Sequence, residues 1–224
     1  MNLSRDREKC LKGVREHHAL LVYPLENRAE PPSLWKVLHP RSPMRWEWDQ
    51  DGDDRVSRLW ILREELSRSG EVVYSKWFRG RATFFSKEAF VHLLRALRSH
   101  ERELHLRGEA RVLYDLMRES SPRSTKELKT ESDLRGRLLE GVYQRAMKEL
   151  FEAGLVVAWG EVDEGAFPSL ATGATRVLFE DLWEKAASGE AKASLAWLEK
   201  NLPSDFARYL KRKRAASRDA VDEG

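Results

Sequence analysis

The chain has 224 residues, of which 34% are charged, and 40 Lys and Arg against 37 Asp and Glu leave a formal net charge of +3. This length allows one large or two small domains with cores of their own, and the single cysteine, Cys10, excludes a disulfide framework and a cysteine-based zinc site. No apolar run approaches the roughly 20 residues that cross a bilayer, and the first residues lack the apolar core of a signal peptide, so we expect a cytoplasmic protein with no membrane contact.

A first unit is expected over residues 1–98. Its predicted elements, in chain order, are a helix over 4–20, a short strand over 20–25, a helix over 55–69, strands over 72–78 and 81–85, and a helix over 87–99. The order helix, hairpin, helix within 55–97 is that of a degenerate winged-helix-like unit, so the chain is expected to hold two such units in tandem.

The segment between the first strand and the next helix is rich in proline and tryptophan. Because prolines fix the backbone, residues 24–54 are expected to be irregular and anchored to the core by aromatic side chains. Trp46 and Trp48 alternate with charged residues, which leaves a base-stacking platform as an alternative. The acidic run at residues 49–54 has Trp60 where a calcium loop has its twelfth-position glutamate, so we interpret it as a turn before a helix.

The turn between the two predicted strands is basic. Lys76, Arg79 and Arg81 cluster around Gly80. A protruding basic hairpin suits a DNA backbone or a minor groove, where concentrated negative potential attracts arginine. The alternative is an ordinary turn whose charges are solvated.

A second unit, residues 99–187, has the pattern of a helix-turn-helix followed by a two-strand wing. Its predicted elements are a helix over 101–119 interrupted at Gly108, a helix over 126–129 capped by a preceding Ser or Thr, a helix over 132–153, a strand over 155–159, a loop over 161–175, a strand over 176–179 and a helix over 181–187. The expected fold class is therefore α+β, mainly α, with a winged helix-turn-helix domain. A third segment, 188–224, holds C-terminal helices and a basic run at 211–214, which we interpret as a solvated helix end.

The helix predicted over 132–153 is amphipathic. Its apolar face carries Leu138, Leu139, Val142, Tyr143, Ala146, Met147 and Leu150. Its polar face carries Arg137, Gly141, Gln144, Arg145 and Lys148. Winged helices commonly lay this helix in the major groove of double-stranded DNA, so the polar face and the basic turn are the candidate DNA contacts, and Gly141 would allow close backbone approach. Arginine supplies 27 of the 40 basic residues, which favours phosphate and guanine recognition, although genomic base composition would give the same bias.

No catalytic, metal or cofactor site is predicted. The chain has no Gly-rich phosphate loop, Gly-x-Ser-x-Gly elbow or His-Glu-x-x-His motif. His17 and His18 are adjacent and point about 100° apart on a helix, whereas helical metal ligands are usually three or four residues apart. A carboxylate pair assembled only in space would leave no such signature, so the sequence does not exclude one.

Two stretches resemble a known family. Residues 73–86 (VYSKWFRGRATFFS) and residues 142–150 (VYQRAMKEL), the latter leading to Leu155-Val156-Val157, resemble parts of the winged-helix DNA glycosylases of the AlkZ (YcaQ) type and their shorter AlkZ-related relatives. The resemblance covers about residues 55–185. It implies tandem winged helices, a DNA-binding groove and, in catalytic members, removal of alkylated bases or unhooking of interstrand crosslinks.

Catalytic members of that family carry a Gln-x-Gln or Gln-x-Asp motif, which this chain lacks. Gln50 is followed two places later by Gly52, and Gln144 by Ala146. Hydrolysis of a glycosidic bond requires groups that position water and stabilise the developing sugar cation. The resemblance therefore implies DNA binding in a repair context without catalysis.

Three alternatives are left open. A dimeric winged-helix transcriptional regulator would use the same helix on a palindromic operator and prefer one sequence. A divergent DNA glycosylase would use unrecognised carboxylates. A protein-docking winged helix would have no salt-dependent affinity for DNA. The sequence leaves the oligomeric state, the lesion preference and the protein partners undetermined.

Overall fold

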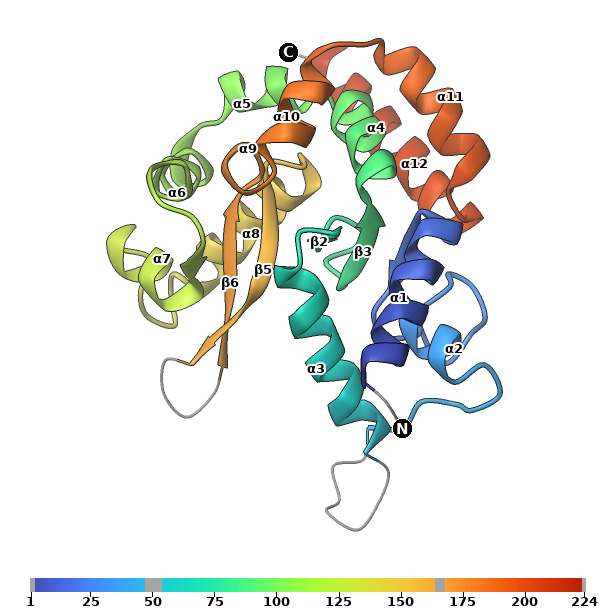
Figure 1. The fold of residues 1–224 in the computed structure, drawn as a ribbon. Coiled ribbons are helices and arrows are strands. Elements are labelled where there is room, and N and C mark those ends of the chain that lie inside the picture. Colours follow the sequence, from blue (N-terminus) through green and yellow to red (C-terminus); the bar gives the residue numbers. More distant parts are fainter. Residues whose placement is uncertain (1–2, 47–53, 164–167, 223–224) are drawn as a thin grey trace.

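The computed structural model describes residues 3–46, 54–163 and 168–222 of the chain. It is an α+β fold, mainly helical, with an antiparallel sheet between its helices (Figure 1). The elements in chain order are α1 (Leu3–His17), β1 (Ala19–Leu21), α2 (Leu34–Leu38), α3 (Arg55–Arg68), β2 (Val72–Ser75), β3 (Thr83–Ser86), α4 (Lys87–Leu97), α5 (Ser99–His105), α6 (Gly108–Glu119), β4 (Arg123–Ser124), α7 (Thr125–Glu131), α8 (Glu140–Glu152), β5 (Val156–Asp163), β6 (Pro168–Ala174), α9 (Thr175–Leu178), α10 (Glu180–Ala187), α11 (Ala191–Asn201) and α12 (Ser204–Asp222).

The strands of the described residues form one six-stranded sheet in the order β1-β3-β2-β5-β6-β4. Every neighbouring pair is antiparallel, and β2 meets β5 where Tyr74 faces Ala158. Strands from the expected units 1–98 and 99–187 therefore lie in the same sheet. This continuity brings the hairpin of β2 and β3 close to α8, which directly precedes β5.

Alternate residues of the central strands enter two separate cores. Tyr74 and Phe84 pack with α1 and α3 on one face of the sheet, while Val73 and Phe85 pack with α4 and the later helices on the other. Successive strand residues point to opposite faces, so a run that is buried throughout requires cover on both sides. Figure 1 shows this arrangement, with α1 and α3 apart from the group formed by α4, α10, α11 and α12.

In the proline- and tryptophan-rich segment, the tryptophan that is buried in the core is Trp35 and not Trp46. Trp35 in α2 is fully buried, and its indole N–H donates to the carbonyl of Ser42 at 2.9 Å. Trp46 is 59% exposed and lies against Tyr23, with ring centroids 4.9 Å apart. The prediction of an anchored segment is confirmed for Trp35 and wrong for Trp46. Trp48 and the acidic residues 49–53 lie outside the described residues.

The second helix of the predicted helix-turn-helix begins later than expected. The sequence predicts a start near Ser132, but α8 begins at Glu140. Asp133 and Gly136 have φ angles of 57° and 94°, so the backbone passes twice through the left-handed region and cannot continue as a helix. Two assignments change as a consequence. Arg137 lies in the turn, not on the helix, and Leu138, expected on the apolar face, is 95% exposed.

The strand that returns beside β5 is also not the predicted one. Residues 176–179 were expected to return, but β6 pairs with β5 over Pro168–Ala174, and α9 follows at once. Thr175 ends the strand, since its backbone N–H donates to the Leu155 carbonyl and its hydroxyl to the Gly154 carbonyl, both at 2.8 Å. The small residues of β6 gave a weak strand signal. Gly173 is required for space, because a Cβ there would lie 2.5 Å from Leu178 Cδ1.

The short helix α7 begins at a capping box, as the Ser- and Thr-rich sequence predicts. Ser124 Oγ accepts from the Glu127 backbone N–H at 3.1 Å, and the Glu127 carboxylate accepts from the Ser124 N–H at 2.7 Å. Two otherwise unpaired amides are thus satisfied. These bonds also account for the lowered pKa of the Glu127 carboxyl.

Ser124→Ala is expected to lower the free energy of unfolding by about 1 kcal/mol, because the cap is lost at a buried site. Urea denaturation followed by circular dichroism measures this change. An unfolding midpoint equal to that of the wild type would contradict the importance of the cap.

Candidate nucleic-acid interface

The hairpin tip, defined as residues 76–82, is a tight turn with an outward arginine. Arg79 and Gly80 have φ angles of 52° and 69°, and the Arg81 N–H closes the turn on the Phe78 carbonyl at 2.9 Å. A left-handed arginine is uncommon, so the surrounding packing has to impose it. Arg79 and Arg81 are consequently both exposed.

Aromatic packing against α12 fixes the hairpin tip. The Phe78 ring lies 4.5 Å from that of Phe206 and 5.1 Å from that of Tyr209, and Trp77 lies 5.0 Å from Tyr209, measured between centroids. Trp77, Phe78 and Phe206 are at most 1% exposed. Because these rings are buried together, the tip is held against α12 and cannot move independently of it.

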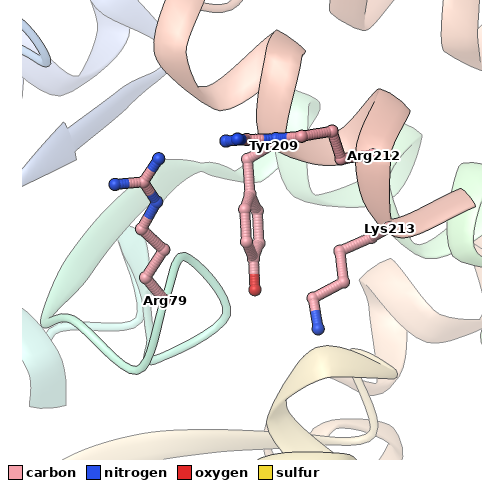
Figure 2. A pocket seen from close by; sticks show the side chains of 4 residues that line it. All are labelled: Arg79, Tyr209, Arg212 and Lys213. Carbon is pink, nitrogen blue, oxygen red and sulfur yellow. The ribbon is translucent and has the colours of Figure 1, made fainter. Parts of the chain in front are cut away.

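Beside this packing is an open cavity of about 400 Å³, here called the tip cavity. It is lined by Arg79 from the tip and by Tyr209, Arg212 and Lys213 from α12. Figure 2 shows Arg79 and Lys213 on opposite sides of the Tyr209 ring. Within the described part of the chain, Arg79 and Arg212 have no carboxylate at ion-pair distance. Three cations around one opening make the tip cavity suited to an anion.

One carboxylate lies at the edge of the tip cavity. Glu152, at the end of α8, pairs with Lys213 Nζ at 2.8 Å and accepts a hydrogen bond from the Tyr209 hydroxyl at 3.1 Å. Burial, followed by the charge of Glu152, raises the pKa of Tyr209 to about 12. Tyr209 therefore remains a neutral hydroxyl at neutral pH, and Glu152 connects α12 to α8.

A second cavity, of about 330 Å³, lies between the hairpin tip and α8 and is here called the groove cavity. Its lining residues are Lys76, Gly80, Thr125, Tyr143, Gln144, Met147, Lys148, Phe151, Leu170 and Thr172. Lys76 and Gly80 come from the tip, and Gln144 and Lys148 come from α8. Arg79 lines the tip cavity and the adjacent Gly80 lines the groove cavity, so the hairpin tip contributes to both cavities.

The wall of the groove cavity is partly apolar and its rim is cationic. Tyr143, Met147 and Phe151 follow one another at helical spacing along α8 and are almost fully buried. Burial raises the pKa of Tyr143 to about 12, opposed by a hydrogen bond with Thr125. Lys148 is exposed and, among the described residues, pairs with no carboxylate. The combination of apolar wall and cationic rim is that of a site for an anionic ligand with an organic part.

Lys76 differs from Lys148, the other cation of the groove cavity, because it is half-buried. Its pKa is lowered by burial, which disfavours the charged amine, and by the charge of nearby Arg63, while Glu161 acts in the opposite direction. Arg63 and Glu161, the two charged groups that act on Lys76, form an ion pair whose side chains are only 8% and 12% exposed. Lys76 therefore faces the cavity with a positively charged group near it and little water.

The predicted contact residues fall into two groups. Lys76, Gln144 and Lys148 line the groove cavity, and Arg79 lines the tip cavity. The remaining predicted contacts, which line neither cavity, are Arg81, Arg137, Gly141 and Arg145, and all are exposed. Gln144 is partly engaged, because its amide donates to the Glu140 carboxylate at 2.9 Å.

Sequence reasoning missed the contribution of α12. Tyr209, Arg212 and Lys213 line the tip cavity, whereas the basic run 211–214 was interpreted as a solvated helix end. The run itself was the available signal. The sequence does not predict that this run lies beside the hairpin tip, because the packing of Phe206 and Tyr209 on the hairpin decides which side of α12 faces the tip.

The described residues contain no group of three or more His, Cys, Asp and Glu side chains that could hold a metal ion. Over the same ranges, no helix combines the length and the apolar character needed to cross a membrane.

Fold and site together define a mainly helical α+β protein with adjoining basic cavities between a hairpin and two helices. A model of the AlkZ-related family matches residues 6–213, and the chain belongs to this family. The predicted resemblance to the AlkZ-related proteins is thereby confirmed, and it relates the chain to DNA-repair glycosylases. No curated protein and no solved structure matches the chain.

Proposed function

We propose that this protein binds double-stranded DNA in a repair context through a winged helix and the hairpin tip, without hydrolysing a glycosidic bond. The order α6, β4, α7, α8, β5, β6, with β6 paired to both β4 and β5, supports a winged helix. In such a domain α8 is the helix that approaches the bases. Family membership supports the repair context.

One observation carries the proposal: the hairpin tip and α8, both predicted to bind DNA, line the same cavity. Lys76 and Lys148 lie on its two sides, and Arg79 and Arg212 continue the cationic surface into the tip cavity. A row of cations along a groove follows a phosphate backbone and releases its counterions. Arg137 in the turn, with Gly141 and Arg145 on α8, would extend the contact, and Arg81 would extend it on the tip.

Arg145→Ala is expected to weaken DNA binding about fivefold at 0.1 M salt and to reduce the slope of log K against log salt by about 1, because one phosphate contact is lost. Fluorescence anisotropy with a labelled duplex at several salt concentrations measures both quantities. The matched control is Lys192→Ala on α11, which removes an exposed cation on a helix packed against α4. Equal affinity and slope in Arg145→Ala and wild type would reject this residue as a contact.

The competing functions give different results with the same protein. A palindrome-binding regulator would elute as a two-fold dimer and prefer one duplex over scrambled ones. A divergent glycosylase would release abasic sites from alkylated or crosslinked DNA. A protein-docking module would show no salt-dependent DNA affinity. The proposal requires salt-dependent binding to duplex without release of bases.

A further inference from the structure

Two amines line the groove cavity, Lys76 and Lys148, and Lys76 is the half-buried one. Lys76 forms no hydrogen bond or ion pair within the described residues, although it is half-buried and lines the cavity. The three hydroxyls of the lining are occupied. Thr125 donates to the Leu170 carbonyl at 3.2 Å, Thr172 donates to Met117 Sδ at 3.6 Å, and the Tyr143 hydroxyl is hydrogen-bonded with Thr125. Of the two cavity amines, Lys148 is exposed to water, so Lys76 is the candidate nucleophile for a ligand inside this cavity.

The surroundings of Lys76 are those that activate a lysine. An amine becomes a nucleophile when it is neutral, and both removal from water and a neighbouring cation favour the neutral form. Burial and then the charge of Arg63 act in this direction on the pKa of Lys76 and outweigh the opposing charge of Glu161. The apolar side chains of Met147 and Phe151 line the same cavity. An exposed surface lysine would lack both influences.

From this placement we propose that Lys76 forms a Schiff base with an aldehyde bound in the groove cavity, and that the natural aldehyde is the ring-opened sugar of an abasic site in DNA. The proposal rests on the proposed DNA binding. An abasic sugar combines an aldehyde carbon with flanking phosphates, which matches an amine inside the groove cavity, Lys148 on the same cavity, and Arg79 and Arg212 in the tip cavity. The cavity volume of about 330 Å³ lies at the lower end of small-ligand sites, about 300–1,000 Å³.

The chemistry requires no cofactor. The neutral amine of Lys76 attacks C1′ of the aldehyde, loss of one water molecule gives the imine, and the imine nitrogen takes a proton from solvent. The imine makes the C2′ hydrogen acidic, so that a proton passes from C2′ to water, and the C3′–O bond then breaks with its electron pair leaving on the 3′ phosphate. Hydrolysis of the imine restores the amine and releases an unsaturated aldehyde on the 5′ fragment. The strand is cut by elimination, without oxidation or reduction.

The test is reductive trapping on a duplex that contains one abasic site, with sodium cyanoborohydride and protein at concentrations that saturate the DNA. The wild type is expected to form a covalent complex, and peptide mass spectrometry is expected to locate the linkage at Lys76. Lys76→Arg keeps the charge but cannot form the imine, so the adduct yield per bound duplex is expected to fall at least about tenfold. In Lys148→Arg, the control on the same cavity, the linkage is expected to remain at Lys76.

Two outcomes would overturn the assignment while leaving DNA binding intact. One is an abasic duplex that binds without forming any adduct. The other is an adduct whose yield is equal in the wild type and Lys76→Arg, which would place the reaction on a different amine. Thermal unfolding of each variant checks that the fold is retained.

A second probe separates failure of this proposal from failure of DNA binding. Free 2-deoxyribose 5-phosphate with cyanoborohydride requires no duplex, and the 13 lysines of the chain compete for it. Preferential labelling of Lys76 is expected, with a rate that rises with pH through an inflection below the ordinary lysine pKa of about 10.4. Uniform labelling of the exposed lysines would refute a reactive Lys76 whether or not the protein binds DNA.

Discussion

The double variant Arg79→Glu/Lys148→Glu is expected to lose salt-dependent binding to duplex DNA, with affinity lower by on the order of a hundredfold at 0.1 M salt. Arg79 lines the tip cavity and Lys148 lines the groove cavity, and the hairpin tip contributes residues to both cavities. Charge reversal would remove two of the proposed phosphate contacts and would add two negative charges that repel DNA. Anisotropy titrations over a range of salt concentrations measure the affinity and its slope.

The matched control is Lys192→Glu/Lys200→Glu. Both lysines are exposed on α11, which packs against α4. The change in net charge is the same as in Arg79→Glu/Lys148→Glu, here called the groove variant. A uniform charge effect would lower the affinity of both double variants equally, whereas a local interface predicts a loss confined to the groove variant. Equal losses of affinity in the two double variants would contradict a role for the groove and tip cavities in the proposed DNA binding.

Arg63→Met is expected to lower the free energy of unfolding by about 3 kcal/mol, because it leaves the Glu161 carboxylate unpaired in a nearly buried position. Glu161 joins β5 to α3, where its backbone N–H also donates to the Glu64 carboxylate at 3.1 Å. Arg63 lies over the Trp60 ring at 4.0 Å, so packing is lost as well. Urea denaturation measures the change.

Two further variants show whether the effect arises from the buried charge. Arg63→Met/Glu161→Leu removes both charges and is expected to recover much of the lost stability, since apolar replacement of a buried pair is often neutral. Arg208→Met breaks the pair between Arg208 and Asp205, in which the side chain of Arg208 is 67% exposed and that of Asp205 is 25% exposed. This variant is expected to change the free energy of unfolding by less than about 1 kcal/mol. A double variant as unstable as Arg63→Met would show that packing, not charge, dominates at this site.

Much of the secondary structure was predictable because it depends on neighbouring residues. The start of α4 at the Ser86 cap and the capping box at Ser124 both follow from hydroxyls placed before helical stretches. The break between α5 and α6 follows from Gly108, which has a φ of 53°. The errors occurred where non-local contacts override such signals, as at β6, whose small residues become a strand only beside β5.

The candidate site was predictable in its parts but not in its assembly. The sequence indicated a basic hairpin and a helix bearing Gln144, Arg145 and Lys148, but it contained no information that Lys76 and Lys148 would line one cavity. The left-handed residues Asp133 and Gly136 shortened the helix and moved Arg137 into the turn.

By itself the amino-acid sequence determined the class of the fold, most of its helices, the basic character of the hairpin and the relationship to the AlkZ-related family. Tertiary structure alone decided that the hairpin tip meets α8 and that Arg212 of α12 joins Arg79. The physical reason is the distance along the chain over which each kind of interaction acts. Caps, turns and periodicity act within a few residues, whereas the cavities form only after one sheet unites distant strands and buried aromatic rings hold the tip on α12.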